Sequence, residues 1–207
     1  MADRKLFDSS GNYGTVILNW TGYLVYEFSR MARAFHSTGR DASDRLKENS
    51  AIGVDGWPPH DFLAYPVAFL YRHALELHMK AIILAGAPVF DLRQRPTVDR
   101  HTLLKTHCLE VLRTDFERVW AEFHWSWDFG SPKLQSIHDF RGLLAEFHEV
   151  DARSFSFRYP VTTKEAPSLP RGFRMNVFSF ADSLDPLLLA LAGLPLAAEE
   201  ALEVIYE

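Results

Sequence analysis

Three charged residues, Arg72, Glu76 and Lys80, follow one another at intervals of four, so on a helix they lie along one line with the anion between two cations. If that line faces solvent, we expect a salt-bridge ladder that contributes a few tenths of a kcal/mol per pair. If it is buried, each charge needs a partner. Glu76 would then be the hub, because a carboxylate can accept from both neighbours and from Arg158 of the segment Phe157-Arg158-Tyr159-Pro160.

Arginine and histidine also occur in pairs that could act on a phosphate. Histidine exchanges a proton near neutral pH, and arginine neutralises charge that develops on a phosphoryl group. Six pairs have four to six residues between the Arg and the following His, so the spacing alone selects none of them. Arg141 and His148 would share one face of a helix, about 10.5 Å apart along its axis, which allows both to address one phosphodiester without a metal.

Hydrophobic periodicity predicts the elements that must position these residues. Apolar positions repeat every three or four residues in several stretches, and Leu70, Ala74, Leu77, Ala81 and Leu84 form the most regular stripe. The predicted helices cover residues 17–39, 66–86, 102–120, 133–150 and 172–191, and an amphipathic tail covers 197–207. A polar connector separates the first two, and 154–160 is expected to be an ordered loop or short strand. We therefore predict a single all-α domain over 1–207, an up-and-down bundle with its core in 15–192.

Composition narrows the function classes. Of the 207 residues, 47% are hydrophobic and 24% charged, which is typical of a globular domain, and the net charge of −5 argues against non-specific binding of nucleic acid. The one cysteine, Cys108, predicts neither a disulfide nor a cysteine zinc site. The start shows no secretory signal, and the apolar stretch 187–198 is shorter than the roughly 20 residues of a membrane span. We expect a cytoplasmic protein without a metal or cofactor.

Two parts of the sequence together resemble the HEPN family, the higher eukaryote and prokaryote nucleotide-binding domains. The helix 71–84 carries Glu and Lys four residues apart, and a proline-containing loop leads from it to His101-Thr102-Leu103-Leu104. Arg158-Tyr159-Pro160 is similar to a motif that some members place before their last helix. The resemblance covers roughly residues 15–192 and implies a homodimeric helical protein.

The resemblance implies two functions. One is a non-cleaving nucleotide- or partner-binding module, using Arg72, Glu76, Lys80 and Arg158, of a toxin–antitoxin or defence system with a nucleotidyltransferase-type partner. The other is a metal-independent endoribonuclease that cleaves RNA with Arg141 and His148, because Phe140-Arg141 and His148 lie where such members keep their motif. Gly142 follows the Arg where those members often have a polar residue.

A third possibility comes from two His-Asp doublets, His60-Asp61 and His138-Asp139. Such doublets resemble those of metal-dependent phosphohydrolases of the HD class. His101 and Asp182 would then have to complete the metal shell around His138 and Asp139. Because two doublets are close to what chance gives in a chain of this composition, we predict no metal site.

Overall fold

The computed structural model describes residues 16–18, 21–52 and 60–206, and every named element in this part is a helix. The helices are α1 (Leu24–Ile52), α2 (His60–Gly86), α3 (Pro88–Leu92), α4 (Arg100–Lys105), α5 (Leu109–Glu122), α6 (Ile137–Asp151), α7 (Val177–Leu191) and α8 (Leu194–Tyr206). The predicted all-α bundle is confirmed. No helix of the described residues combines the length and apolar character that crossing a membrane requires.

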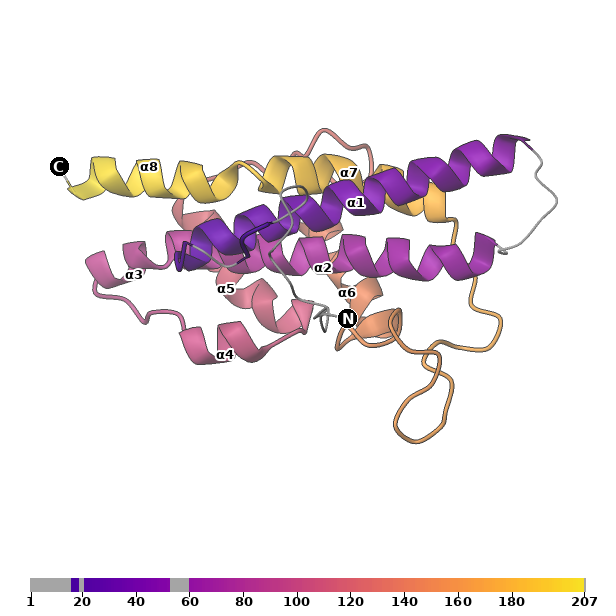
Figure 1. Cartoon of the computed structure of the whole chain (residues 1–207). Coiled ribbons are helices and arrows are strands. Elements are labelled where there is room, and N and C mark those ends of the chain that lie inside the picture. The colour runs from indigo at the N-terminus through magenta and orange to yellow at the C-terminus, as the bar shows by residue number, and fades with distance from the viewer. Residues whose placement is uncertain (1–15, 19–20, 53–59, 207) are drawn as a thin grey trace, which may run out of the picture.

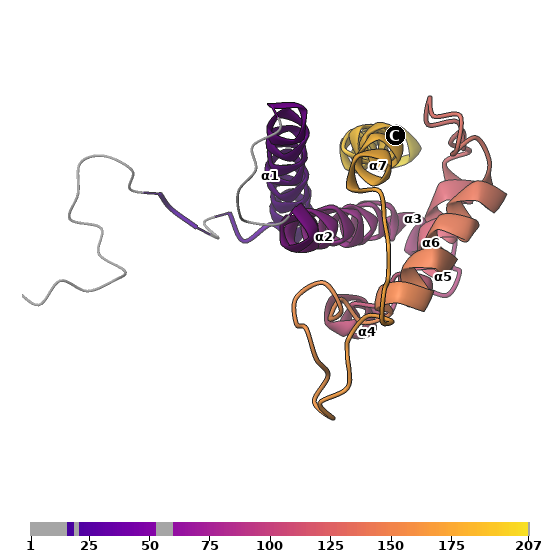
Figure 2. The same cartoon turned by 90° about the vertical axis from the view of Figure 1, so that its right-hand side faces the viewer.

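Helix α2 lies at the centre of the bundle. It runs antiparallel to α1, with α7 and α8 along another side, and the view in Figure 2 shows α5 and α6 beside it (Figures 1 and 2). Ala74, Leu77 and Ala81 of the predicted stripe are buried, and Leu70 and Leu84 are half-buried. Every residue from 74 to 83 is buried, polar ones included. The central position of α2 therefore draws its charged residues into the interior.

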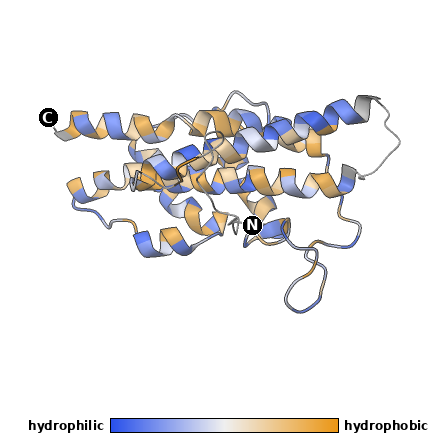
Figure 3. Ribbon diagram, viewed as in Figure 1, coloured by the Kyte–Doolittle hydropathy of each residue, from blue (hydrophilic) through white to orange (hydrophobic). Residues whose placement is uncertain are grey.

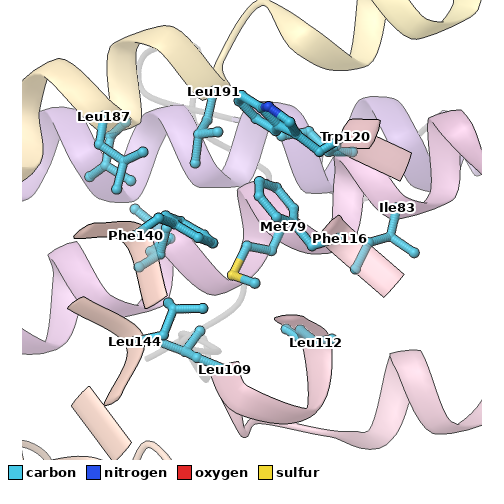
Figure 4. Close-up of a cluster of buried hydrophobic side chains, with 14 of the residues drawn as sticks. Met79, Ile83, Leu109, Leu112, Phe116, Trp120, Phe140, Leu144, Leu187 and Leu191 are labelled. Carbon is cyan, nitrogen blue, oxygen red and sulfur yellow. The ribbon is translucent and has the colours of Figure 1, made fainter. Parts of the chain in front are cut away.

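The main hydrophobic core lies where α2, α5, α6 and α7 meet (Figure 4). Phe116 of α5 stacks on Phe140 of α6 with ring centroids 5.2 Å apart. Trp120 is 2% exposed, and its indole Nε1 donates to the Trp125 carbonyl at 2.8 Å. Its polar atom is thus satisfied while the ring fills the core.

Helix α1 extends well beyond its predicted end at residue 39. The segment 40–52, expected to be a polar connector, is helical, with Ser43 and Leu46 facing inward. Most of its other residues are charged, and Figure 3 shows this end of α1 as largely hydrophilic. The stripe begins later than predicted, because Ile17 lies outside the helix and Met31 is exposed. Trp20 and residues 53–59 lie outside the described residues.

Gly39 permits close contact between α1 and α2 instead of ending α1. A methyl group there would lie 3.0 Å from Cδ2 of Tyr71 and 3.2 Å from Cβ of Leu70. Tyr71 is fully buried and has little room to move. We expect Gly39→Ala to destabilise the protein by about 1 to 2 kcal/mol, because the clash outweighs the gain in helix propensity.

Gly142 supplies the matched control. It lies within α6, and a Cβ added there meets nothing within 4 Å. Gly142→Ala is therefore expected to stabilise the protein by about 0.5 to 1 kcal/mol. Urea unfolding of both variants measures the difference, and an equal change in the free energy of unfolding would contradict the proposed close contact at Gly39.

The predicted helix 102–120 is two helices, α4 and α5, separated by residues 106–108. The break shifts the inward face, so Leu104 and Val111, expected to be inward, are 40% and 50% exposed. Val119 is buried as predicted, and Cys108 is half-buried at the N-cap of α5. The break also brings residue 107 to the side of α2.

The later elements differ from prediction mainly at their ends. Helix α6 buries the predicted residues Phe140, Leu144 and Phe147. Helix α7 is not split at Asp185-Pro186, because Pro186 is accommodated inside a continuous helix. Helix α8 begins at Leu194, before the predicted tail. The segment 154–160 forms turns and no strand, and it belongs to the long loop between α6 and α7.

Candidate functional site

The charged line of α2 is buried inside the bundle. The side chains of Arg72, Glu76 and Lys80 are 0%, 1% and 3% exposed. Arg72 Nη1 donates to Glu76 Oε2 at 3.2 Å, and Lys80 Nζ donates to Glu76 Oε1 at 2.9 Å. The ladder is not a solvated face, and none of the three side chains can contact a ligand at the surface.

Two residues from other elements complete this buried network. Arg72 Nε lies 3.2 Å from Oδ2 of Asp151, at the end of α6, and donates to the Asp151 carbonyl at 3.2 Å. Arg72 Nη2 donates to the carbonyl of His107 at 2.6 Å, and His107 Nδ1 lies 3.0 Å from Glu76 Oε1. Arg72 and Lys80 thus face Glu76 and Asp151, so the buried charges balance.

The network keeps Glu76 ionised. Burial by itself raises the pKa of this carboxyl, but the charge and hydrogen bond of Lys80 and the hydrogen bond of His107 outweigh burial and lower the pKa below its ordinary value. Burial lowers the pKa of Arg72, and the carboxylates of Asp151 and Glu76 oppose that change. Glu76 is therefore the hub, as expected for a buried line.

Arg158 does not reach Glu76, and that part of the prediction is wrong. Its Nε donates to the Ser154 carbonyl, and its guanidinium lies 5.7 Å from the ring centroids of both Phe69 and Tyr159. His107 occupies the position at Glu76 that Arg158 was expected to take, and Asp151 is a second anion that faces Arg72. Sequence reasoning missed both because His107 lies in the break between α4 and α5 and Asp151 at the end of α6, outside any periodic pattern.

Asp151 links the buried network to the loop that follows α6. Its Oδ1 accepts from the backbone N–H groups of Phe155 and Ser156 at 2.6 and 2.7 Å, and the residue is 1% exposed. The same carboxylate thus faces Arg72 and ties down the first residues of the loop. The buried charges therefore hold the start of the segment that carries Phe157 and Arg158.

This loop and the first turns of α2 enclose a cleft of about 660 Å³. Tyr65, Phe157 and Phe173 supply aromatic rings, and Asp61 and Arg174 supply a carboxylate and a guanidinium. A second hollow of about 310 Å³ shares Phe157, Phe173 and Arg174 with it and continues along α6. Both volumes fall in the range of small-molecule sites. We call the first hollow the loop cleft.

Arg141 and His148 both lie on the exposed side of α6 but have different partners. Arg141 makes a bidentate pair with Glu117 of α5, at 2.8 and 2.6 Å. Glu117 also bonds Arg113, and these hydrogen bonds hold its pKa below the ordinary value. His148 Nδ1 lies 3.7 Å from Cys108 Sγ. The guanidinium expected to bind phosphate is thus already engaged by a carboxylate.

The His-Asp doublets do not assemble a metal site among the described residues, where no group of three or more ligand side chains is close enough to hold an ion. Asp139 instead supports the N-terminus of α6, where its Oδ2 accepts from Oγ of the N-cap Ser136 at 2.7 Å and from the Gln135 N–H. Asp61 lies at the loop cleft, and the side chain of His60 lies outside the described part of the chain.

Comparisons with models of protein families, with curated proteins and with solved structures gave no match to this chain.

Proposed function

We propose that this protein is a non-cleaving, HEPN-like module that binds a nucleotide in the loop cleft. The observation that carries the proposal is the combination of rings and charges around that cleft. Tyr65, Phe157 and Phe173 could stack on a base, because aromatic rings stack on any nucleobase. Arg174 could bind a phosphate, and the Asp61 carboxylate could accept from a ribose hydroxyl.

The buried network supports binding indirectly, because it fixes the start of the loop that lines the cleft. Arg72 and Glu76 contact no surface ligand, but Asp151 joins them to the start of the loop. A binding loop that is fixed before the ligand arrives loses less conformational entropy when the ligand binds. In this proposal the charged residues of α2 position the cleft, and Arg174 replaces them as the contact to phosphate.

The engagement of Arg141 favours binding over cleavage. A phosphodiester at Arg141 would have to displace Glu117, which holds the guanidinium with two hydrogen bonds. A freed Glu117 would then lie beside an incoming anion. Cleavage by Arg141 and His148 therefore requires a rearrangement, whereas the loop cleft is already formed.

We expect isothermal titration calorimetry to detect binding of at least one of AMP, GMP and ATP. Arg174→Ala should weaken that binding by about tenfold or more, because a charge-assisted hydrogen bond to phosphate is lost. Phe173 is 37% exposed, and Phe173→Ala should weaken binding about tenfold through loss of stacking. Arg171→Ala is the matched control, since Arg171 is a neighbouring exposed cation that does not line the cleft, and it should bind as the wild type does.

Two results would contradict this proposal. One is the absence of heat with all three nucleotides. The other is RNA cleavage that persists in EDTA and falls by about 100-fold in His148→Ala, which would establish the ribonuclease alternative instead.

A further inference from the structure

His107 presents one ring nitrogen to solvent and the other to a buried anion. Its side chain is 55% exposed, whereas Glu76, 3.0 Å from Nδ1, is 1% exposed. Because Nδ1 points inward, the accessible side of the ring is the side of Nε2. The ring thus joins the buried network to the surface between α4 and α5.

The charge of Glu76 determines which nitrogen carries the proton. An ionised carboxylate only accepts hydrogen bonds, and the pKa of Glu76 is held below its ordinary value. The neutral ring must therefore carry its hydrogen on Nδ1 and its lone pair on Nε2. A carboxylate that bonds one nitrogen of a histidine fixes the tautomer and orients the ring.

The backbone at His107 is also fixed. Its carbonyl accepts from the buried Arg72, and Thr106 and Cys108 on either side are the C-cap of α4 and the N-cap of α5. The positive end of the α5 dipole lies next to residue 107, so an anion held there is favoured.

Other described histidines lack this combination. His36 bonds the Asp185 carboxylate at 2.7 Å, but its side chain is only 8% exposed. His78 is fully buried. His148 is exposed, and its Nδ1 contacts the Cys108 sulfur and not a carboxylate.

From this geometry we propose that His107 is a phosphoryl acceptor, which takes a phosphoryl group on Nε2 from a phosphoramidate or acyl phosphate donor. The Nε2 lone pair attacks phosphorus, a P–N bond forms, and the bond from phosphorus to the leaving group breaks. With phosphoramidate, whose nitrogen is protonated, ammonia leaves with the electron pair of the broken bond. The ring gains one positive charge and keeps its Nδ1 hydrogen, which Glu76 faces. This site is separate from the loop cleft and does not depend on nucleotide binding.

The test is to incubate the full chain with potassium phosphoramidate and to follow the protein by intact-mass spectrometry and phosphorus NMR. We expect the mass of one phosphoryl group in an adduct that is labile to acid and stable to alkali, attached to Nε2 of His107. His107→Gln should take up none. His124→Asn is the matched control and should be labelled as the wild type is, because His124 is an exposed histidine at φ 53, a conformation that asparagine tolerates.

Glu76→Gln tests the positioning role of the carboxylate. If this variant folds, labelling should be about tenfold slower, and the phosphoryl group should be distributed over both ring nitrogens, because the amide no longer selects one tautomer. A change in stability alone would not alter the site of attachment. The proposal is overturned if the wild type takes up no phosphoryl group, if His107→Gln is labelled equally, or if the group is found on Nδ1 in the wild type. The last two results are obtained with the wild type and with His107→Gln, whose substitution is at an exposed side chain, so neither depends on whether Glu76→Gln folds.

Discussion

Glu76→Gln is expected to lower the free energy of unfolding by about 3 to 5 kcal/mol. Glutamine keeps the shape of the side chain but removes its charge, so Arg72 would keep only Asp151 as an anion and Lys80 would lose the carboxylate that it pairs with. Both cations are almost fully buried and cannot recover the lost interaction from water. Removing one partner of a buried pair is costly because an uncompensated charge stays in the interior.

Glu117→Gln is the matched control for this measurement. Glu117 also accepts from two cations, Arg113 and Arg141, but those arginine side chains are 31% and 49% exposed. Water can solvate them when the carboxylate is neutralised, so we expect a loss below about 1 kcal/mol. Urea unfolding at neutral pH compares the two variants, and equal losses would contradict the assignment of Glu76 as a buried hub.

The contribution of Glu76 has a defined pH dependence. Its pKa in the folded protein is lowered, so its stabilisation is complete above the pKa of the unfolded chain and is lost as the pH falls through the folded value. Glu76→Gln should therefore approach the wild type in stability under acid conditions. Arg158→Ala should add to Glu76→Gln without coupling, because Arg158 contacts Ser154, Phe69 and Tyr159 and not the hub.

The fold could be predicted where burial follows a simple period. Helix α2 and the stripe of α6 were recognisable because their apolar residues recur every three or four positions. The second half of α1 was not, because only a few small or apolar residues, such as Ser43 and Leu46, face the core there. The predicted helix end at residue 39 is wrong, because the lack of a side chain at Gly39 serves the contact with Tyr71 inside a longer helix.

The site could be predicted only in part, for a related reason. The line of Arg72, Glu76 and Lys80 follows from spacing along one helix, which the sequence shows directly. The partners His107 and Asp151 come from a helix break and a helix end, and their position depends on how separate helices pack. The spacing of residues along one helix does not predict how that helix packs against others. The cleft has the same origin, because its walls come from α2 and a loop about 100 residues later.

His78→Leu is expected to make the protein much less sensitive to acid. His78 lies on α2, is fully buried, and neither ring nitrogen has a hydrogen-bond partner among the described residues. Burial lowers the pKa of His78 to about 3, and the positive charges of His36 and Arg33 act in the same direction. The folded protein therefore holds this ring neutral over most of the acid range.

The sign of the effect follows from proton binding. As the pH falls below about 6.5, the unfolded chain takes up a proton on residue 78 and the folded protein does not, so stability falls. Each pH unit between about 6.5 and 3 costs about 1.4 kcal/mol, which sums to roughly 5 kcal/mol at the acid end. The leucine side chain has no group that can bind a proton, so this part of the pH dependence disappears in the variant.

Urea unfolding of the wild type and His78→Leu at several pH values between 7 and 4 measures this difference. At pH 7 the two should differ by less than about 1.5 kcal/mol, because leucine is similar in volume and no hydrogen bond to the described residues is lost. The advantage of the variant should then grow steadily as the pH falls. His101→Gln, which changes an exposed histidine, should follow the wild type.

Other acid-sensitive groups are common to all three proteins, including His73, whose pKa is also lowered by burial. Only the difference between the curves therefore reports on residue 78. Parallel curves for the wild type and His78→Leu would show that the folded protein protonates this ring as readily as the unfolded chain does, which would contradict the lowered pKa of His78.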